Sequence, residues 1–520
     1  MKPELIKSLK GYNKQKLFSD LLAGLMVAII ALPLSIALGI QSVPEGVGMN
    51  GIQAGIITAI VAGFFISALG GSRYQIGGPT AAFVVILFGY LSNPEIGVLG
   101  LAIAGLMAGV ILILLGALRC GSVMKFFPYP ITIGFTTGIG ITLILGQIKD
   151  FLGLTGGAAH VTGLEAVDKV IGYANNIGTF NLATFGVGLV GLACVILLPK
   201  LSKKIPAAFV ALIVCTGLTF LLNGVAGASV ATIGSRYGEI KAGFFPIDFS
   251  FIGSVNFGAL IVPAIVIAFL CAIESLLSAT VASGMTGSTF NPNQELIGQG
   301  AANIFSSLLG GLPATGAIAR TAASIENGAK SSLAGMFHAV FVLIMYFLLM
   351  GVVQYIPLSV FSAILTSVAI NMSRFKLFSK LARFGVRDGI ILLATCILTV
   401  LFDLTYGVLG GVALTLLLNV KGMKVGVKTE VKEEQGKKKV FASGILYFIN
   451  VNKVVDLINK EMENVDGISL DLSGVESIDQ TALEKISTLI KKSAASGKAL
   501  TLDNANEKVQ ARMDKFLKVL

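Results

Sequence analysis

The chain has 520 residues, of which 54% are hydrophobic and only 13% are charged, with a mean hydropathy of +0.85. Soluble chains carry about 25% charged residues, so the composition excludes an ordinary soluble protein and predicts an integral protein of the lipid bilayer. The positive-inside bias of membrane proteins accounts for the net charge of +11 better than nucleic-acid binding does. We therefore expect no nucleic-acid partner.

The chain shows no pattern of a metal, disulfide or enzyme site. Its five cysteines form no CxxC pair, and its two histidines, His160 and His338, are far apart in sequence. We therefore expect no resident metal and no cofactor. There is no P-loop, no dinucleotide-binding glycine fingerprint and no nucleophile–base motif. The chain is predicted not to be an enzyme, and any uphill transport would use an ion gradient.

Apolar segments define the organisation of the chain, and we count about fourteen. A full crossing needs about twenty residues, so the third and tenth segments are too short to cross alone. Each is predicted to be half a helix joined to extended chain. A polar, lysine-rich segment (1–19) precedes them, and no cleavable signal peptide is expected. The segments lie near residues 20–40, 51–70, 79–91, 98–118, 124–147, 182–199, 205–223, 259–283, 294–310, 315–326, 332–352, 357–372, 387–402 and 404–420.

Basic residues cluster before the first segment and after the even-numbered ones. Examples are Lys2 to Lys16, Arg73, Arg119, Lys330 and the group from Arg374 to Arg387. By the positive-inside rule this alternation places both termini in the cytoplasm, and we expect the cytoplasmic (inner) membrane as the location. Two long loops, 148–181 and 224–258, then fall on the outer side, and we assign them no role.

Two glycine–proline breaks, one in each half of the chain, are the most informative feature of the sequence. The first reads GGPTAAF (77–83) and the second reads GLPATGAIAR (311–320). Paired interruptions of this kind indicate the substrate site of a transporter built from inverted repeats. A broken helix leaves backbone N–H groups unpaired at a positive dipole end. Such groups are tolerated only in a cavity or within protein, and they favour an anion.

Glu274 lies inside an apolar segment, and Ser278 follows four residues later on the same helical face. A carboxylate at the bilayer centre costs at least about 2.5–3.5 kcal/mol, and intramembrane acids are functional by default. The two residues are therefore candidates for ion coupling. Together they would bind Na⁺, or Glu274 would carry a proton. The alternative is a structural ion pair or a hydrogen bond to a broken helix.

Arg320 and two threonines, Thr80 and Thr315, stand at the breaks. A cation beside a half-helix N-terminus would add positive potential to an anion site. The alternative is that Arg320 pairs with Glu274 and neutralises it. Each threonine hydroxyl either donates to the anion or caps a half-helix, and capping is the commoner role.

The tail changes character after Val420. Residues 20–420 are predicted to form the transmembrane transport domain, 421–438 a charged linker, and 439–520 a small cytoplasmic α/β domain. In that last domain the sequence predicts strands at 439–450, 468–473 and 499–505. It predicts helices at 451–463 and 479–493, and a final amphipathic helix that follows the last strand and ends at Leu520.

Two residues of the tail attract attention at the start of the helix 479–493. Asp479 is predicted to be the N-cap of that helix. Thr481 is a candidate phosphorylation position, where added negative charge would alter docking.

The sequence resembles the SulP anion transporter family over nearly its full length, and its tail resembles the STAS domain. The stretches that carry the likeness are GSRYQIGGPTAAF (71–83), NPNQELIGQGAANIFSSLLGGLPATGAIARTAASIENGAKSSLAG (291–335) and FDLTYGVLGGV (402–412). The resemblance implies an α-helical polytopic fold of fourteen segments, arranged as a 7+7 inverted repeat with core and gate domains. It also implies a homodimer to which the STAS domains contribute.

The family resemblance also implies a site. The anion would sit between the facing ends of the third and tenth segments, beside an acidic residue of the eighth. That residue is Glu274 here, with Ser278 one turn later, and the coupling ion would be Na⁺ or H⁺. Carried onto this chain, the anion-binding positions are Gly78, Thr80, Ala81, Ala82, Thr315, Gly316, Ala317, Ile318, Ala319 and Arg320.

The chain departs from the family pattern in three places. Leu34 and Leu38 stand where some members carry a glutamine and an aromatic residue, which argues against a hydrogen bond from the first segment to the anion. Ala319 stands where certain animal relatives have serine. Gln480 breaks the serine pair of the phosphorylated STAS proteins, which argues against phosphorylation of the neighbouring threonine.

These observations predict secondary-active transport of a small anion, coupled to Na⁺ or H⁺, by alternating access. Sulfate, bicarbonate and dicarboxylates such as fumarate are the candidate substrates. If the same breaks lined an open pore, the chain would instead be an uncoupled anion channel. If it bound the anion without flux, it would be a sensor that signals through the STAS domain.

Overall fold

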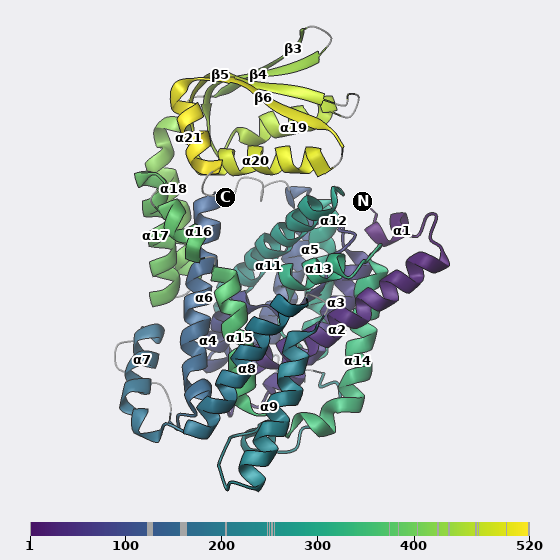
Figure 1. Cartoon of the computed structure of the whole chain (residues 1–520), viewed down its shortest axis with the longest axis vertical. Helices are drawn as coiled ribbons and strands as arrows, with labels where there is room; N and C mark the ends of the chain where they lie inside the picture. Colours follow the sequence, from purple (N-terminus) through teal and green to yellow (C-terminus); the bar gives the residue numbers. More distant parts are fainter. Residues whose placement is uncertain are drawn as a thin grey trace. The chain divides into compact units, whose positions relative to one another are not determined.

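The computed structural model describes residues 2–121, 128–156, 164–202, 205–246, 248, 250, 253, 255–373, 375–382, 384–402, 404–423, 426–434, 437–462, 465, 467–495 and 497–517. His160, Arg374 and Arg383, which entered the sequence predictions, lie outside these residues. The described chain is largely helical, with a small sheet near its C-terminus (Figure 1). Contacts divide it into two compact units, which are described in turn.

The fourteen predicted segments are all present as helices or half-helices. They are α2 (Lys14–Ser42), α3 (Gly51–Leu69), α4 (Ala81–Ser92), α5 (Gly97–Ala117), α6 (Tyr129–Leu152), α8 (Leu182–Leu201), α9 (Ala207–Gly224), α11 (Phe257–Thr286), α12 (Pro292–Leu308), α13 (Ile318–Glu326), α14 (Leu333–Val353), α15 (Leu358–Ser373), α17 (Val386–Leu401) and α18 (Leu404–Met423). Among the described residues, nine helices are long and apolar enough to cross a membrane.

The third and tenth segments are half-helices preceded by extended chain, as predicted. Strand β1 (Gly77–Gly78) leads into α4, and strand β2 (Thr315–Gly316) leads into α13. The two strands pair antiparallel, with Gly77 opposite Gly316 and Gly78 opposite Thr315. The two breaks, more than 230 residues apart in sequence, therefore lie side by side inside the first unit.

Small residues allow the helices around the breaks to pack closely. Helices α5 and α12 cross at Gly109 and Gly300. A Cβ atom added at Gly109 would lie 2.7 Å from the carbonyl oxygen of Gly300, and one added at Gly300 would lie 2.5 Å from that of Gly109. The crossing therefore requires glycine on both helices, the use that membrane proteins make of small residues.

The two long loops also contain short helices that the sequence did not predict. Helix α7 (Glu165–Asn175) and a 3₁₀ turn (Ile177–Thr179) lie in the first loop, and α10 (Ile233–Tyr237) lies in the second. Thr232 caps α10 in a capping box with Ser235, in which each side chain accepts from the other residue's backbone N–H. A short helix α1 (Glu4–Ser8) precedes the first span.

The second unit contains the C-terminal domain, helices α16 (Phe375–Ala382), α17 and α18, and the first turns of α6. Four strands form its sheet in the order β3 (Val427–Glu434), β4 (Lys437–Leu446), β5 (Gly467–Ile478) and β6 (Ala499–Ala505). Strands β3 and β4 are antiparallel, and the other two pairings are parallel. Helices α19 (Val451–Glu461), α20 (Gln480–Ala495) and α21 (Glu507–Leu517) accompany the sheet (Figure 1).

The tail matches the predicted alternation of strands and helices, but the predicted charged linker is wrong in part. Residues 427–434 form strand β3 rather than linker. The sequence VKTEVKEE hides the strand because its charged side chains dominate the composition. Its β-branched residues, Val427, Thr429 and Val431, alternate with them, and such alternation is the strand period.

The helix cap predicted in the tail is confirmed. Asp479 Oδ1 accepts from the N–H of Ala482 at 2.7 Å, and Oδ2 accepts from the N–H of Phe448 at 2.9 Å. Thr481 is buried, and its hydroxyl oxygen accepts from the N–H of Tyr129 at the start of α6. Phosphorylation of Thr481 would have to break that contact, and its role stays a prediction.

Candidate functional site

The candidate site is the junction where the two half-helices begin. The N–H of Ala317 donates to the carbonyl of Ile76 at 2.8 Å, and the N–H of Gly316 donates to the hydroxyl of Ser275 on α11 at 3.0 Å. Two breaks and a third helix are thereby fixed to one another. All ten predicted anion positions, Gly78, Thr80 to Ala82 and Thr315 to Arg320, belong to these two segments.

The N-termini of the two half-helices have no side-chain caps. The N-cap of α4 is Thr80 and that of α13 is Ala317, and neither side chain hydrogen-bonds to its own helix. The first-turn N–H groups at Ala81, Ala82, Ile318 and Ala319 are therefore left without a side-chain acceptor. An N-terminus in this state carries partial positive charge and available donors, which is the arrangement that binds anions.

Glu274 explains why the threonines do not cap. Its Oε2 atom accepts a hydrogen bond from Thr80 Oγ1 and another from Thr315 Oγ1, each at 2.9 Å. One carboxylate oxygen thus joins the two breaks, and the alternative in which the threonine hydroxyls cap the half-helices is wrong. No described residue hydrogen-bonds to the other oxygen, Oε1. That oxygen and the lone pairs of the two hydroxyls stay available to a cation or a proton.

Ser278 is not joined to Glu274 by a hydrogen bond. Its hydroxyl lies 3.3 Å from Thr321 Oγ1 on α13, and Thr321 also accepts from the N–H of Ile76. Glu274 and Ser278 lie on one face of α11, as predicted. Ser278, however, contacts the body of α13, whereas Glu274 contacts the breaks. Its role in holding a coupling ion stays a prediction.

Arg320 does not pair with Glu274. Its Nη2 atom donates to the carbonyl of Pro79 at 3.1 Å and lies 3.5 Å from the hydroxyl of Ser35 on α2. The side chain is 2% exposed, and Nη1 is buried without a hydrogen-bond partner in the described part of the chain. The alternative that Arg320 pairs with Glu274 is therefore wrong, and its electropositive role beside the start of α4 stays a prediction.

Gly78 makes room for this guanidinium. A Cβ atom at Gly78 would lie 2.1 Å from Arg320 Nη1. The residue also has a φ of +150°, a conformation that side chains rarely adopt. The glycine of the first break is thus required by the arginine of the second.

The sequence reasoning missed a second carboxylate, Glu295 of α12. It is fully buried and accepts four hydrogen bonds. Oε2 accepts from the N–H groups of Gly71 and Ser72, and Oε1 accepts from the amides of Gln75 and Gln299, all between 2.9 and 3.0 Å. It holds the chain that enters β1. The signal that would have found it is the acid in NPNQE, at the edge of an apolar segment.

A pair of uncapped half-helices that meet among apolar helices, with a buried arginine at the junction, is the arrangement expected of a membrane transporter built from inverted repeats. The sequence profile of the Sulfate permease family matches residues 17–395, and that of the STAS domain matches residues 428–517. The chain belongs to the Sulfate permease family, and it carries a C-terminal STAS domain. The predicted family and the predicted STAS domain are thereby confirmed.

Relatives of known name agree with this membership. The chain is 40% identical over 424 residues to the putative sulfate transporter YvdB of Bacillus subtilis, covering 82% of this chain and 77% of the relative. It is 28% identical over 527 residues to the bicarbonate transporter BicA of Picosynechococcus, covering 96% and 90%. Both are named transporters rather than enzymes, in agreement with the prediction that the chain is not an enzyme.

Solved structures share the fold. The transmembrane domain of a cyanobacterium bicarbonate transporter BicA superposes with a TM-score of 0.67 at 28% identity, covering 76% of this chain and 98% of that one. The overall structure of SLC26A9 superposes with a TM-score of 0.72 at 20% identity, covering 99% and 89%. The predicted helical fold with a small C-terminal α/β domain is therefore confirmed.

Proposed function

We propose that the protein is a secondary-active transporter that binds a small anion between the N-termini of α4 and α13. The observation that carries this proposal is the pair of uncapped N-termini held side by side by β1 and β2. Two sets of backbone donors, the positive dipole ends of two helices and the charge of Arg320 favour an anion together. The relatives named for sulfate and bicarbonate transport support an inorganic oxyanion as the substrate. Dicarboxylates such as fumarate are included among the substrates to be tested.

Glu274 is the proposed coupling residue. Its hydrogen bonds with Thr80 and Thr315 connect it to both breaks, so a change in its charge alters the electrostatic potential at the start of both half-helices. A Na⁺ ion would use carboxylate and hydroxyl oxygens, both of which are present there, and a proton would use the carboxylate alone. Either ion would offset the negative charge that otherwise repels the incoming anion, and this gives a physical reason for coupled binding.

The remaining parts of the proposal concern orientation and assembly. The charge pattern favours cytoplasmic termini in the cytoplasmic membrane, and we propose a homodimer that moves its anion site between the two faces by alternating access. Rigid packing of the half-helices through the Glu274 and Arg320 contacts favours movement of the whole site as one body.

Uptake into proteoliposomes tests the function. Labelled sulfate, bicarbonate and fumarate are offered in turn, each with an imposed Na⁺ gradient, an imposed proton gradient, or none. We expect saturable, concentrative uptake of one anion with one of the two gradients. Uptake that never exceeds equilibrium and shows channel-sized currents would identify an uncoupled channel. Saturable binding of an anion without any flux would identify a sensor.

A further inference from the structure

The segment that precedes α2 exposes both lysines and apolar side chains. Lys2, Lys10 and Lys14 are exposed, and the ammonium group of each has no hydrogen-bond or ion-pair partner among the described residues. Ile6 and Leu9, at the end of helix α1, are 51% and 46% exposed. They are three residues apart in helical geometry, so they lie on the same face of the helix. The segment therefore presents an apolar face next to unpaired cations.

Glu4, on the buried side of α1, fixes this segment to the chain that enters β1. Its N–H donates to the carbonyl of Gly70 at 3.0 Å, and its Oε1 atom accepts from Arg73 Nη2 at 3.2 Å. Glu4 is two residues before Ile6 and five before Leu9, and at 3.6 residues per turn these spacings place it on the opposite side of the helix. The contacts of Glu4 therefore leave the apolar face of α1 directed away from the first unit.

Asp20 fixes the chain at the other end of this segment. Its carboxylate is fully buried and accepts from the hydroxyl of Tyr12 at 2.6 Å and from the N–H of Ser331 at 3.1 Å. Ser331 lies in the loop between the half-helix α13 and α14. Glu4 and Asp20 are the only acidic residues among the first twenty of the sequence. Because both are buried and engaged elsewhere, neither neutralises the three unpaired lysines.

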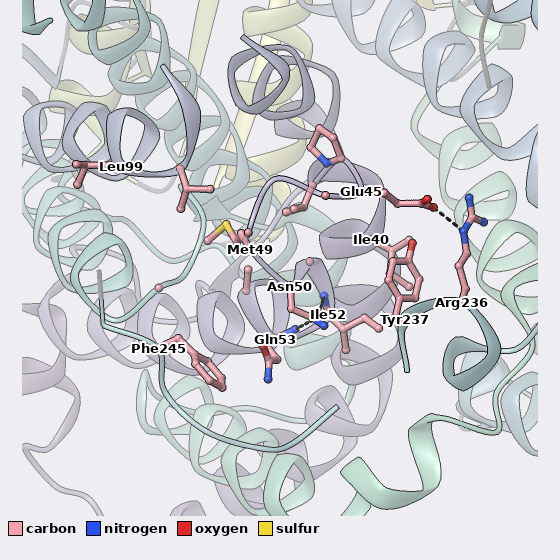
Figure 2. Close-up of a pocket in the computed structure, with 18 of the residues that line it drawn as sticks. Ile40, Glu45, Met49, Asn50, Ile52, Gln53, Leu99, Arg236, Tyr237 and Phe245 are labelled. Atoms are coloured by element: carbon pink, nitrogen blue, oxygen red, sulfur yellow. Dashed lines mark hydrogen bonds and ion pairs between the residues drawn. The ribbon is translucent and has the colours of Figure 1, made fainter. Parts of the chain in front are cut away.

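An arginine in the loops predicted to face outward gives the opposite case. Arg236 of α10 donates from Nε to Glu45 Oε1 and from Nη1 to Asp150 Oδ1, both at 2.6 Å. Figure 2 shows the contact with Glu45 in the wall of a cavity of about 710 Å³. Two carboxylates neutralise this cation within the protein. The lysines before α2 have no such partners in the described part of the chain, so their charge is available to an external anion.

The position of the segment determines which anion it meets. Helix α2 begins at Lys14 and is long and apolar enough to cross a membrane, so the residues before it lie beside the headgroups of one leaflet. Lysines grouped directly next to a membrane span attract acidic phospholipids, and apolar side chains of an interfacial helix insert at the boundary of the acyl chains. The positive-inside bias accounts for the lysines, but not for the exposed Ile6 and Leu9 beside them.

We propose that residues 2–14 form a docking surface for anionic phospholipids of the leaflet beside the start of α2. Lys2, Lys10 and Lys14 bind the phosphate groups of the headgroups, and Ile6 and Leu9 enter the boundary of the acyl chains. This lipid binding goes beyond the proposed transport, and it is measurable whether or not the chain transports an anion.

Native mass spectrometry of the full chain tests the headgroup contacts. The protein is equilibrated in mixed micelles with phosphatidylglycerol and phosphatidylcholine in equal amounts, and the bound molecules of each lipid are counted. We expect the wild type to retain phosphatidylglycerol in preference. The triple variant Lys2→Gln/Lys10→Gln/Lys14→Gln should lower that preference at least about tenfold. No preference in the wild type, or the same preference in the variant, would overturn the docking surface.

Two controls accompany this measurement. Lys453→Gln/Lys460→Gln/Lys508→Gln removes three exposed lysines of the C-terminal domain and should leave the preference unchanged. An equal loss in both triple variants would show that net charge alone selects the lipid, and would overturn the proposal. Free glycerol phosphate in large excess should not displace phosphatidylglycerol, because it has no acyl chains. Displacement would identify a site for soluble phosphate instead of a lipid surface.

Fluorescence quenching tests the apolar contact. The chain contains no tryptophan, so Ile6→Trp introduces a single indole whose emission reports on this position. In nanodiscs of phosphatidylcholine with phosphatidylglycerol brominated on its acyl chains, we expect strong quenching, reduced at least about twofold when the three lysines are also replaced by glutamine. Val431→Trp, at an exposed position of strand β3, is the control. Quenching of Ile6→Trp no stronger than that of Val431→Trp would show that Ile6 does not enter the acyl boundary.

Discussion

Two carboxylates inside the first unit, Glu274 and Glu295, have opposite hydrogen-bonding patterns. Glu295 is fully buried and saturated, with two N–H donors on each oxygen. Glu274 is half-buried and has two hydroxyl donors on one oxygen, and none from a described residue on the other. A saturated carboxylate fixes a loop and resists change, whereas an unsaturated one retains the capacity to bind an ion. The difference separates a structural acid from a functional one.

The largest expected effect is that of Glu274→Gln. The amide keeps the size of the side chain and removes its negative charge, so neither Na⁺ nor a proton is bound there with a gradient-dependent affinity. We expect gradient-driven uptake in proteoliposomes to fall at least about a hundredfold, the order expected when a coupling charge worth about 3 kcal/mol is lost. Thermal stability in detergent should be unchanged. Full concentrative uptake by this variant would remove Glu274 from the coupling role.

The next largest effect is expected for the cation of the site. Arg320→Ala removes a buried charge beside the N-terminus of α4, and charge-assisted contacts are worth about 1.5–3 kcal/mol. Anion affinity, measured by titration calorimetry or substrate-protected thermal melting, should fall about 10- to 100-fold in Arg320→Ala. The loss of affinity in Arg320→Lys should be smaller. Gly78→Ala should weaken binding in the same direction, because its Cβ displaces the guanidinium. Unchanged anion affinity in Arg320→Ala would show that the charge plays no part in binding.

Glu295→Gln gives the contrasting result. Its new NH₂ group would face two of the four N–H donors, and each buried group left without a partner costs about 1–3 kcal/mol. We expect a lower thermal midpoint and a lower yield, with transport per folded molecule within about twofold of wild type. Glu95→Gln, in an exposed loop, is the control for the loss of one charge. If Glu295→Gln lost coupling but kept full stability, Glu295 would be a functional acid like Glu274, and the contrast between the two carboxylates would be wrong.

The smallest effect concerns a third buried acid, in the STAS domain. Burial raises the pKa of Asp479 to about 7, whereas an unfolded aspartate titrates near 4. Protonation therefore favours the folded domain. This contribution is complete below about pH 4, is lost as the pH rises to about 7, and is constant above that value. We expect amide exchange in α20 to accelerate between pH 5 and 7, and less so in Asp479→Asn. The same acceleration in both chains would exclude Asp479 as its source.

The sequence predicted the fourteen segments well because long apolar runs and glycine–proline breaks are local signals. The meeting of the two breaks at one site was also predicted, but from the family resemblance rather than from the chain itself. The partners of individual side chains were not. Helical spacing put Ser278 on the same face as Glu274, but a face spans several neighbours, and the hydroxyls that reach Glu274 come from Thr80 and Thr315.

Other misses have similar physical causes. Glu295 sits in a polar run at the edge of its segment, so hydropathy gave no warning of a buried charge. Strand β3 is rich in lysine and glutamate, so its composition indicated a linker although its alternation indicated a strand. Arg236 forms ion pairs with Glu45 and Asp150, which are 191 and 86 residues away in sequence. Contacts between residues so far apart in sequence produce no local pattern.

The most direct test of the account is to locate the transported anion by electron cryo-microscopy of the chain in lipid nanodiscs, with and without a saturating concentration of that anion. We expect difference density between the N–H groups of Ala81 and Ala82 and those of Ile318 and Ala319, on the side of the junction that Arg320 faces. The same density should be absent in Arg320→Ala at the same concentration. Density found only elsewhere in the chain, or none at saturation, would contradict the central claim that the anion binds between the two half-helices.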